Sequence, residues 1–267
     1  MCLKFAEHFL WIANALMRAG EGTGMWDEED GFFYDVLRLP DGRAERLKVR
    51  SMVGLLPLCV VTVFEGKFLE LYAEVRQRFR QVLEGRPELR RFIHDPATIG
   101  HAGRRLAAVL DEAKLRRVLA VTLDEKEFLS PYGIRALSRH HAEHPYVFRA
   151  GGQEYRVPYL PAESDSAMFG GNSNWRRPIW MPMNALVIRA LLQYHLYCGD
   201  AFTIECPRGS GRRMNLYHVA EESHQTGWTG LIALTMYLFA TSTSEQALEL
   251  GKTAGGVEVE PAPSRKR

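Results

Sequence analysis

The residues best suited to chemistry lie in one short stretch, residues 170–180. It places two amides, two guanidinium groups and two indoles behind a pair of glycines: Gly170, Gly171, Asn172, Ser173, Asn174, Trp175, Arg176, Arg177, Pro178, Ile179 and Trp180. Indole faces stack on the apolar C–H faces of sugar rings, and Asn and Arg supply the in-plane donors and acceptors that hydroxyl groups need. The stretch predicts a carbohydrate-binding loop. The alternative is a loop before a helix whose two indoles are buried in the core.

Two further segments, residues 26–35 and 225–230, combine aromatic and polar side chains beside a predicted helix. Three segments of this kind predict one concave surface that binds an oligosaccharide or a small glycoside. The candidate substrate-binding residues are Trp26, Asp27, Asp30, Asn172, Asn174, Trp175, Arg176, Trp180 and Trp228.

The densest acidic group is the run of four acids at residues 27–30. Its spacing lacks the alternating acids and the distant Glu of a calcium-binding EF-hand loop, so we predict no metal site and no cofactor. Sugar-binding and loop-ordering roles both remain open for Asp27 and Asp30. The three histidines His140, His141 and His144 have no carboxylate or Cys at ligand spacing, which favours a surface cluster without metal.

Composition excludes several other classes of function. The chain has 267 residues, 46% of them hydrophobic, and a net charge of +2. Its arginines are scattered at helical spacing, so we expect no nucleic-acid partner. The four cysteines form no CxxC pair, and no apolar run reaches about 18 residues. We expect a cytoplasmic protein that has no secretory signal and does not bind membranes.

Apolar periodicity predicts helices over residues 5–16 and at about 51–64, 67–84, 112–122, 180–197 and 226–241. Two β-hairpins are expected, near residues 32–49 and 146–158, with turns at 40–42 and 151–152. Residues 242–267 are rich in Ser, Thr, Gly, Glu and Pro, which predicts a poorly ordered tail. These elements favour an all-α body with small β-hairpins.

Five segments, taken in order, resemble glycoside hydrolase family 63 and its mannosylglycerate-hydrolase-like relatives: residues 26–35, 50–58, 128–135, 170–180 and 227–230. The resemblance covers most of residues 1–241. It implies that this domain is part of an (α/α)6 toroid with a sugar cleft at one end. It also implies inverting hydrolysis of α-linked glucose or mannose units. Such chemistry needs one protonated and one ionised carboxylic group, about 6.5–9.5 Å apart.

The sequence departs from the family pattern at three places. The family's general acid lies upstream of residue 26, in a segment that this chain does not contain. Its general base lies in a long stretch that is missing here, between the segments resembling residues 214–222 and 223–228. Arg177 stands where the family favours Gly. No catalytic residue can be carried over, so we expect little activity from this chain alone and a partner polypeptide that supplies the missing part of the toroid.

Three functional hypotheses follow from these departures. The chain is an inactive piece of a glycosidase, a non-catalytic sugar-binding homologue, or a protein whose aromatic loops are ordinary core packing. Carboxylates next to the sugar-binding segments are candidates to replace the missing general acid and base. Glu163 and Asp165 precede the glycine pair, whereas Glu221 and Glu222 are typical of a solvated helix end.

Overall fold

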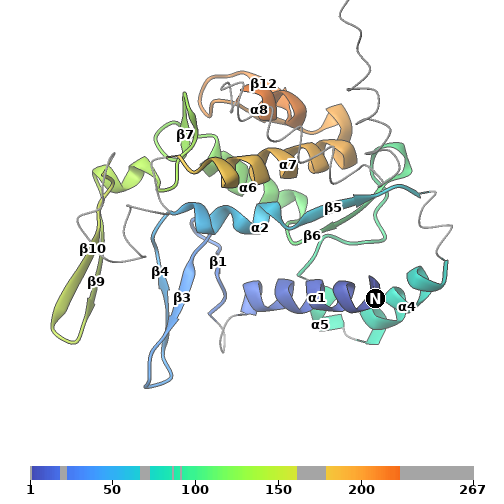
Figure 1. Cartoon of the computed structure of the whole chain (residues 1–267), viewed down its shortest axis with the longest axis horizontal. Helices are drawn as coiled ribbons and strands as arrows, with labels where there is room; N and C mark the ends of the chain where they lie inside the picture. The colour runs from blue at the N-terminus through green and yellow to red at the C-terminus, as the bar shows by residue number, and fades with distance from the viewer. Residues whose placement is uncertain are drawn as a thin grey trace, which may run out of the picture.

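Two helical groups form the body of the molecule, seen in a computed structural model that describes residues 2–18, 23–66, 73–85, 87–90, 92–160 and 179–222 (Figure 1). In the first group, α7 (Met181–Cys198) packs on α8 (Leu216–Glu222), on the short helix α2 (Leu56–Cys59) and on strand β5 (Val61–Phe64). In the second, α1 (Cys2–Arg18) packs on α4 (Ala73–Gly85) and α5 (Pro87–Arg90). The paired strands β5 and β6 (Arg105–Ala108) lie between the two groups in this view.

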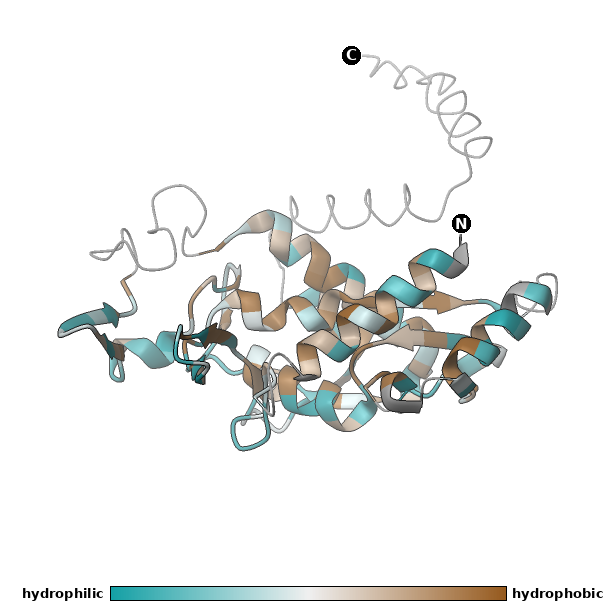
Figure 2. Cartoon of the chain, turned by 90° about the horizontal axis from the view of Figure 1, so that it is seen from below, coloured by the Kyte–Doolittle hydropathy of each residue, from teal (hydrophilic) through white to brown (hydrophobic). Residues whose placement is uncertain are grey.

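Helix α7 is the centre of the main core because it is apolar on most of its surface. It buries a long row of side chains that includes Ile188, Leu191 and Tyr194. The same core contains the aromatic residues of the N-terminal loop, such as Phe32 and Phe33. In Figure 2, brown ribbon gathers in the middle of the molecule, and the hairpins at its left end are largely teal.

Helix α1 organises a second, smaller core. Its three- and four-residue apolar spacing predicted an amphipathic helix, and the structure confirms one. Leu10 and Ala13 are fully buried against Leu83, Leu89 and Ile93 of the neighbouring helices and loop. None of the helices in the described ranges is both long and apolar enough to cross a membrane.

The strands form six separate two-stranded antiparallel sheets within the described part of the chain. They pair in the following order: β1 (Trp26–Asp27) with β2 (Phe32–Phe33), β3 (Asp35–Arg38) with β4 (Ala44–Leu47), β5 with β6 (Arg105–Ala108), β7 (Leu129–Ser130) with β8 (Gly133–Ile134), β9 (Tyr146–Ala150) with β10 (Gln153–Val157), and β11 (Thr203–Glu205) with β12 (Arg213–Asn215). The fold is therefore mixed α and β, and the prediction of an all-α body forming part of an (α/α)6 toroid is wrong.

The helix expected at about 51–64 shows why that prediction failed. A 3-10 helix, η1 (Met52–Leu55), and α2 occupy its first part, but residues 61–64 form β5. The sequence Val-Thr-Val-Phe is rich in β-branched residues, and β5 pairs with β6 more than forty residues later. A local apolar pattern cannot reveal so distant a partner. The local strand pairs around residues 26–33, 129–134 and 203–215 were missed for a different reason, since strands of two or three residues are too short to show an alternating pattern.

Other expectations were met. The hairpins β3–β4 and β9–β10 are confirmed, as are α7 and α6 (Glu112–Thr122). Asp111 caps α6 by accepting a hydrogen bond of 2.8 Å from the backbone N–H of Lys114. Helix α4 begins at Ala73, while residues 67–72, the helix expected at 226–241 and the tail at 242–267 lie outside the described residues. The remaining short 3-10 helices are η2 (His101–Gly103), η3 (Arg139–Ala142) and η5 (Gly199–Ala201).

Candidate functional site

The acidic run at residues 27–30 forms the turn of the β1–β2 hairpin. One carboxylate oxygen of Asp27 accepts hydrogen bonds from the backbone N–H groups of Glu29 and Asp30, each at 3.0 Å. The turn closes at Gly31, whose φ of 65° favours glycine and whose N–H donates to the carbonyl of Asp27 at 2.9 Å. Asp27 is only 5% exposed, so its carboxylate orders the loop from within.

Basic residues from the β4 strand and the segment after it neutralise this turn. The second oxygen of Asp27 lies 3.4 Å from Arg46 Nη1 and 3.2 Å from Lys48 Nζ. Lys48 also lies 3.1 Å from Asp30 Oδ2. Burial acts to raise the pKa of Asp27, but the N–H of Asp30 and the charges of Lys48 and Arg46 outweigh it, so the pKa is lowered. Asp27 is therefore held as a carboxylate.

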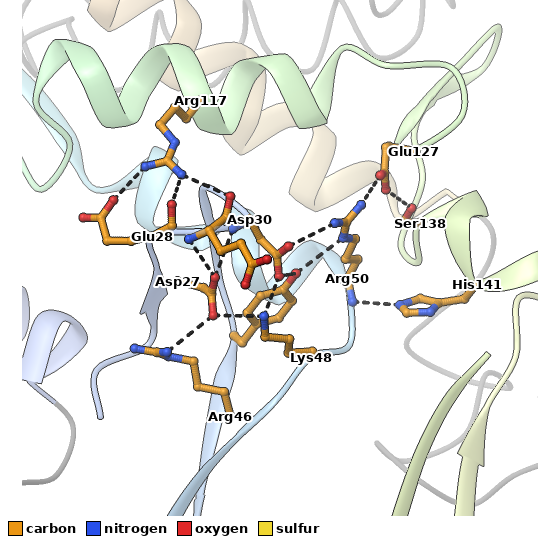
Figure 3. Close-up of polar contacts among 12 residues, drawn as sticks. Asp27, Glu28, Asp30, Arg46, Lys48, Arg50, Arg117, Glu127, Ser138 and His141 are labelled. Atoms are coloured by element: carbon orange, nitrogen blue, oxygen red, sulfur yellow. Dashed lines mark hydrogen bonds and ion pairs between the residues drawn. The ribbon is translucent and has the colours of Figure 1, made fainter. Parts of the chain in front are cut away.

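Arg50 joins the turn to a second region of the chain (Figure 3). Its guanidinium pairs with Glu127, lies 3.5 Å from Asp30 Oδ1, and donates through Nε to the Tyr34 hydroxyl at 3.4 Å. The other oxygen of Glu127 accepts a hydrogen bond from the hydroxyl of Ser138. Arg50 and Glu127 are mostly buried, at 20% and 13% side-chain exposure, so each charge depends on the other.

His141 completes this network as a neutral acceptor. Its Nε2 accepts the backbone N–H of Arg50 at 2.9 Å, which leaves Nδ1–H to donate to the carbonyl of His144 at 2.9 Å. Burial lowers the pKa of His141 to about 4. The expected surface cluster is therefore only partly correct: His140 stacks on His144, but His141 is 3% exposed.

The Trp26 side chain is buried in the core rather than exposed to solvent. Its indole is 7% exposed and lies 4.8 Å from the ring of Phe33. The guanidinium of Arg117 sits 5.2 Å from the Trp26 ring and pairs with Glu28 at 2.7 Å. The indole N–H and, after it, the guanidinium of Arg117 lower the pKa of Glu28.

Trp180 lies at a second junction, where residues 128–135 meet the start of α7. Arg135 and Ile179 form an isolated β-bridge. Within α7, the fully buried Asn184 accepts the N–H of Ile134 at 2.7 Å and donates to the carbonyls of Ile134 and Trp180, both at 3.0 Å. The Trp180 side chain is half-buried against the main core.

Residues far apart in sequence thus meet in one place. The rings of Phe32 and Phe128 stack with centroids 5.6 Å apart. The N–H of Met52 donates to the carbonyl of Ala136, and the N–H of Ser138 donates to the carbonyl of Arg50, both at 2.8 Å. These contacts bring together residues 26–35, 50–58, 128–135 and 179–180. The other predicted sugar-binding residues, Asn172, Asn174, Trp175, Arg176 and Trp228, lie outside the described residues, as do Glu163 and Asp165.

Sequence reasoning missed three residues that organise these contacts: Glu127, His141 and Asn184. Signals existed for two of them. Glu127 directly precedes the segment 128–135, and Asn184 is a polar residue near the start of an otherwise apolar helix. No local pattern marks His141 as the acceptor for the backbone N–H of Arg50, because their sequence separation is 91 residues.

The chemistry of this site is that of paired charges. Asp27, Glu28, Asp30 and Glu127 each face a cation. Over the described ranges, no three side chains of His, Cys, Asp or Glu gather in a way that could hold a metal ion. Burial raises the pKa of the Cys198 and Cys206 thiols to about 11 and of Cys59 to about 12, which disfavours a thiolate nucleophile.

Comparison with known proteins identifies a yeast relative but does not assign the chain to a family. No protein-family profile matches the chain. The chain is similar to the uncharacterized protein YMR196W of Saccharomyces cerevisiae, with 41% identity over 234 residues. The match covers 82% of this chain but 21% of the yeast protein, so the chain spans about a fifth of that relative's length. The name of the yeast protein states no activity.

Proposed function

We propose that this chain is a glycoside-hydrolase-like protein of carbohydrate metabolism that binds an oligosaccharide or a small glycoside. The resemblance to glycoside hydrolase family 63 suggests inverting hydrolysis of α-linked glucose or mannose units as the family reaction. The observation that supports this proposal is the meeting of three of the five resembling segments, residues 26–35, 50–58 and 128–135, with residues 179–180 at the end of a fourth. Convergence of these segments on one place is what a single binding surface requires.

A non-catalytic, sugar-binding role is the second candidate, and the charge pairing favours it. An inverting hydrolase needs a protonated carboxylic acid as proton donor. The pKa values of Asp27 and Glu28 are lowered, which is opposite to what a general acid requires. Asp30 and Glu127 are paired with Lys48 and Arg50. We propose that this chain binds sugar and that a separate polypeptide segment supplies the acid and base. We also propose a cytoplasmic location.

Two measurements on the purified chain test this proposal. Saturation-transfer NMR would report binding of mannosylglycerate, α-glucosides and α-mannosides, and product analysis would report their hydrolysis. We expect weak binding without turnover, since loss of general acid–base assistance alone costs about 10²–10⁴-fold in rate. Binding abolished by Trp175→Ala, with the fold intact, would support residues 170–180 as the binding loop. Failure to bind any of these sugars would contradict the proposal.

Robust turnover would contradict the non-catalytic form of the proposal and identify a relocated carboxylate. The variants Asp27→Ala, Glu163→Ala and Asp165→Ala would then locate it. Glu222 pairs with Arg212 at 2.6 Å on an exposed surface, so Glu222→Ala is the matched control that should leave any turnover unchanged.

A further inference from the structure

Tyr132 is the most exposed large hydrophobic side chain among the described residues. It is 69% exposed at the tip of the tight β7–β8 turn. Its neighbour Gly133 has a φ of 119°, a conformation that glycine tolerates and side chains rarely adopt. A large aromatic ring in full contact with solvent, on a turn that has no internal packing role for it, is available to a ligand.

The turn that carries Tyr132 is rigid. The hydroxyl of Ser130 donates to the carbonyl of Gly133 at 2.7 Å and accepts the N–H of Tyr132 at 3.2 Å. Next to it, both backbone groups of Ile134 bond to the buried amide of Asn184. A Cβ atom on Gly133 would come within 2.8 Å of Asn184 Oδ1, so the turn lies directly against α7. An aromatic ring on an ordered turn loses little backbone entropy when a ligand binds.

The side-chain amide of Asn184 also bonds to the backbone carbonyl of Trp180. Asn184 donates to the carbonyls of Ile134 and Trp180 through one Nδ2 group. The turn and the first residue before α7 are therefore fixed relative to each other, and Figure 1 shows β7 beside the start of α7. Trp180 is also one of the residues predicted to bind sugar.

We propose that Tyr132 is a stacking platform for one pyranose ring of the bound carbohydrate, with Asn184 as the positioning residue that holds its turn beside Trp180. This inference rests on the proposed carbohydrate-binding function and adds a residue that the sequence did not single out. A sugar ring fits better than a protein partner, because stable protein interfaces bury about 800 Å² on each side and this turn presents a single aromatic ring. The ring offers the apolar face that the C–H side of a pyranose needs.

The test is a titration of the full chain with methyl α-D-glucoside, an α-linked mannobiose and mannosylglycerate, followed by NMR. Tyr132→Ala should weaken binding and raise the dissociation constant about three- to tenfold, the range expected for loss of one stacking contact. Tyr132→Phe keeps the ring and should stay within about twofold. Tyr155→Ala is the matched control, because Tyr155 is 40% exposed on the β9–β10 hairpin, outside the Asn184 contacts.

The outcomes separate this inference from the function on which it rests. Binding by the wild-type chain that Tyr132→Ala leaves unchanged would overturn the inference and leave the proposed function standing. An equal loss in Tyr132→Phe would also overturn it, because the hydroxyl rather than the ring face would then carry the contact. If none of the three sugars binds the wild-type chain, the proposed function and this inference both fail.

Discussion

The acidic turn at residues 27–30 and the β7–β8 turn are both tight hairpin turns that end at a glycine with positive φ, but their aromatic residues lie in opposite environments. Both carry an aromatic ring beside polar groups, and both belong to segments that resemble one enzyme family. Yet Trp26 is 7% exposed and Tyr132 is 69% exposed. The acidic turn is held by ion pairs, one of which, Arg117 with Glu28, lies against its indole. The other turn is held by the Ser130 hydroxyl and the buried amide of Asn184, and its ring is exposed. An aromatic-plus-polar motif therefore does not by itself decide whether its ring is buried or exposed.

The sharpest test of this comparison is to remove each ring. Trp26→Ala should lower the free energy of unfolding by about 3–4 kcal/mol, because it deletes a buried aromatic side chain from the main core. Tyr132→Ala should lower it by less than about 0.5 kcal/mol, as expected for an exposed position. Urea unfolding followed by circular dichroism measures both. Similar losses in the two variants would refute the contrast.

The second test removes the amide that secures the β7–β8 turn. Asn184→Leu should cost about 2–3 kcal/mol, because it leaves the carbonyl and the N–H of Ile134 without their side-chain partner in a buried site. The Trp180 carbonyl still accepts the backbone N–H of position 184 at 3.1 Å. It should also speed hydrogen exchange at the amide of Ile134. The matched control is Gln193→Leu on the same helix, since Gln193 is 7% exposed and accepts one hydrogen bond from Val63 at 3.1 Å. The control should cost about 1 kcal/mol and leave exchange at Ile134 unchanged.

The third test uses the pH dependence of the acidic-turn network. Because the pKa of folded His141 is about 4 and that of an unfolded His is about 6.5, the unfolded chain binds the proton first as the pH falls. The stability that neutral His141 contributes is present above about pH 6.5 and is lost as the pH falls towards 4, by about 3 kcal/mol in total. His141→Gln keeps an acceptor for Arg50 and removes the titration.

Wild type and His141→Gln should therefore differ in the slope of unfolding free energy against pH between about 6.5 and 4.5. Burial also lowers the pKa values of His94, His140 and His195, so both proteins lose stability in this window and only their difference reports His141. Parallel curves would show that His141 is not buried as a neutral acceptor.

The smallest expected effect concerns the ion pair at the edge of the acidic turn. Arg50→Gln should cost about 1–2 kcal/mol, because it leaves Glu127 mostly buried without its cation. Arg43→Gln is the control, since Arg43 pairs with Asp41 at 2.7 Å with both side chains well exposed, and it should cost less than about 0.5 kcal/mol. Thermal unfolding at low and moderate salt measures the difference. Equal effects would mean that burial adds nothing to the Arg50 pair.

How much the sequence could predict depended on how local each interaction is. The helices α1, α6 and α7 follow from apolar periodicity, and the hairpins β3–β4 and β9–β10 follow from alternation around turn residues. The pairing of β5 with β6 was missed because its two strands lie far apart in the chain. At the candidate site, the turn-forming role of Asp27 was one of two alternatives, and the contact of Arg50 with Glu127 was not foreseen.

The sequence by itself determined which residue types gather in each segment, the approximate extents of α1, α6 and α7, and the β3–β4 and β9–β10 hairpins. These features depend on neighbours within about one turn of helix or one strand pair. Tertiary structure decided the mixed fold, the burial of Trp26, the exposure of Tyr132 and the pairing of the acidic turn with its cations. Those outcomes depend on contacts such as Arg50 with His141 and Asn184 with Ile134, 91 and 50 residues apart. Contacts at that separation form only when the whole core packs, so residue spacing alone cannot encode them.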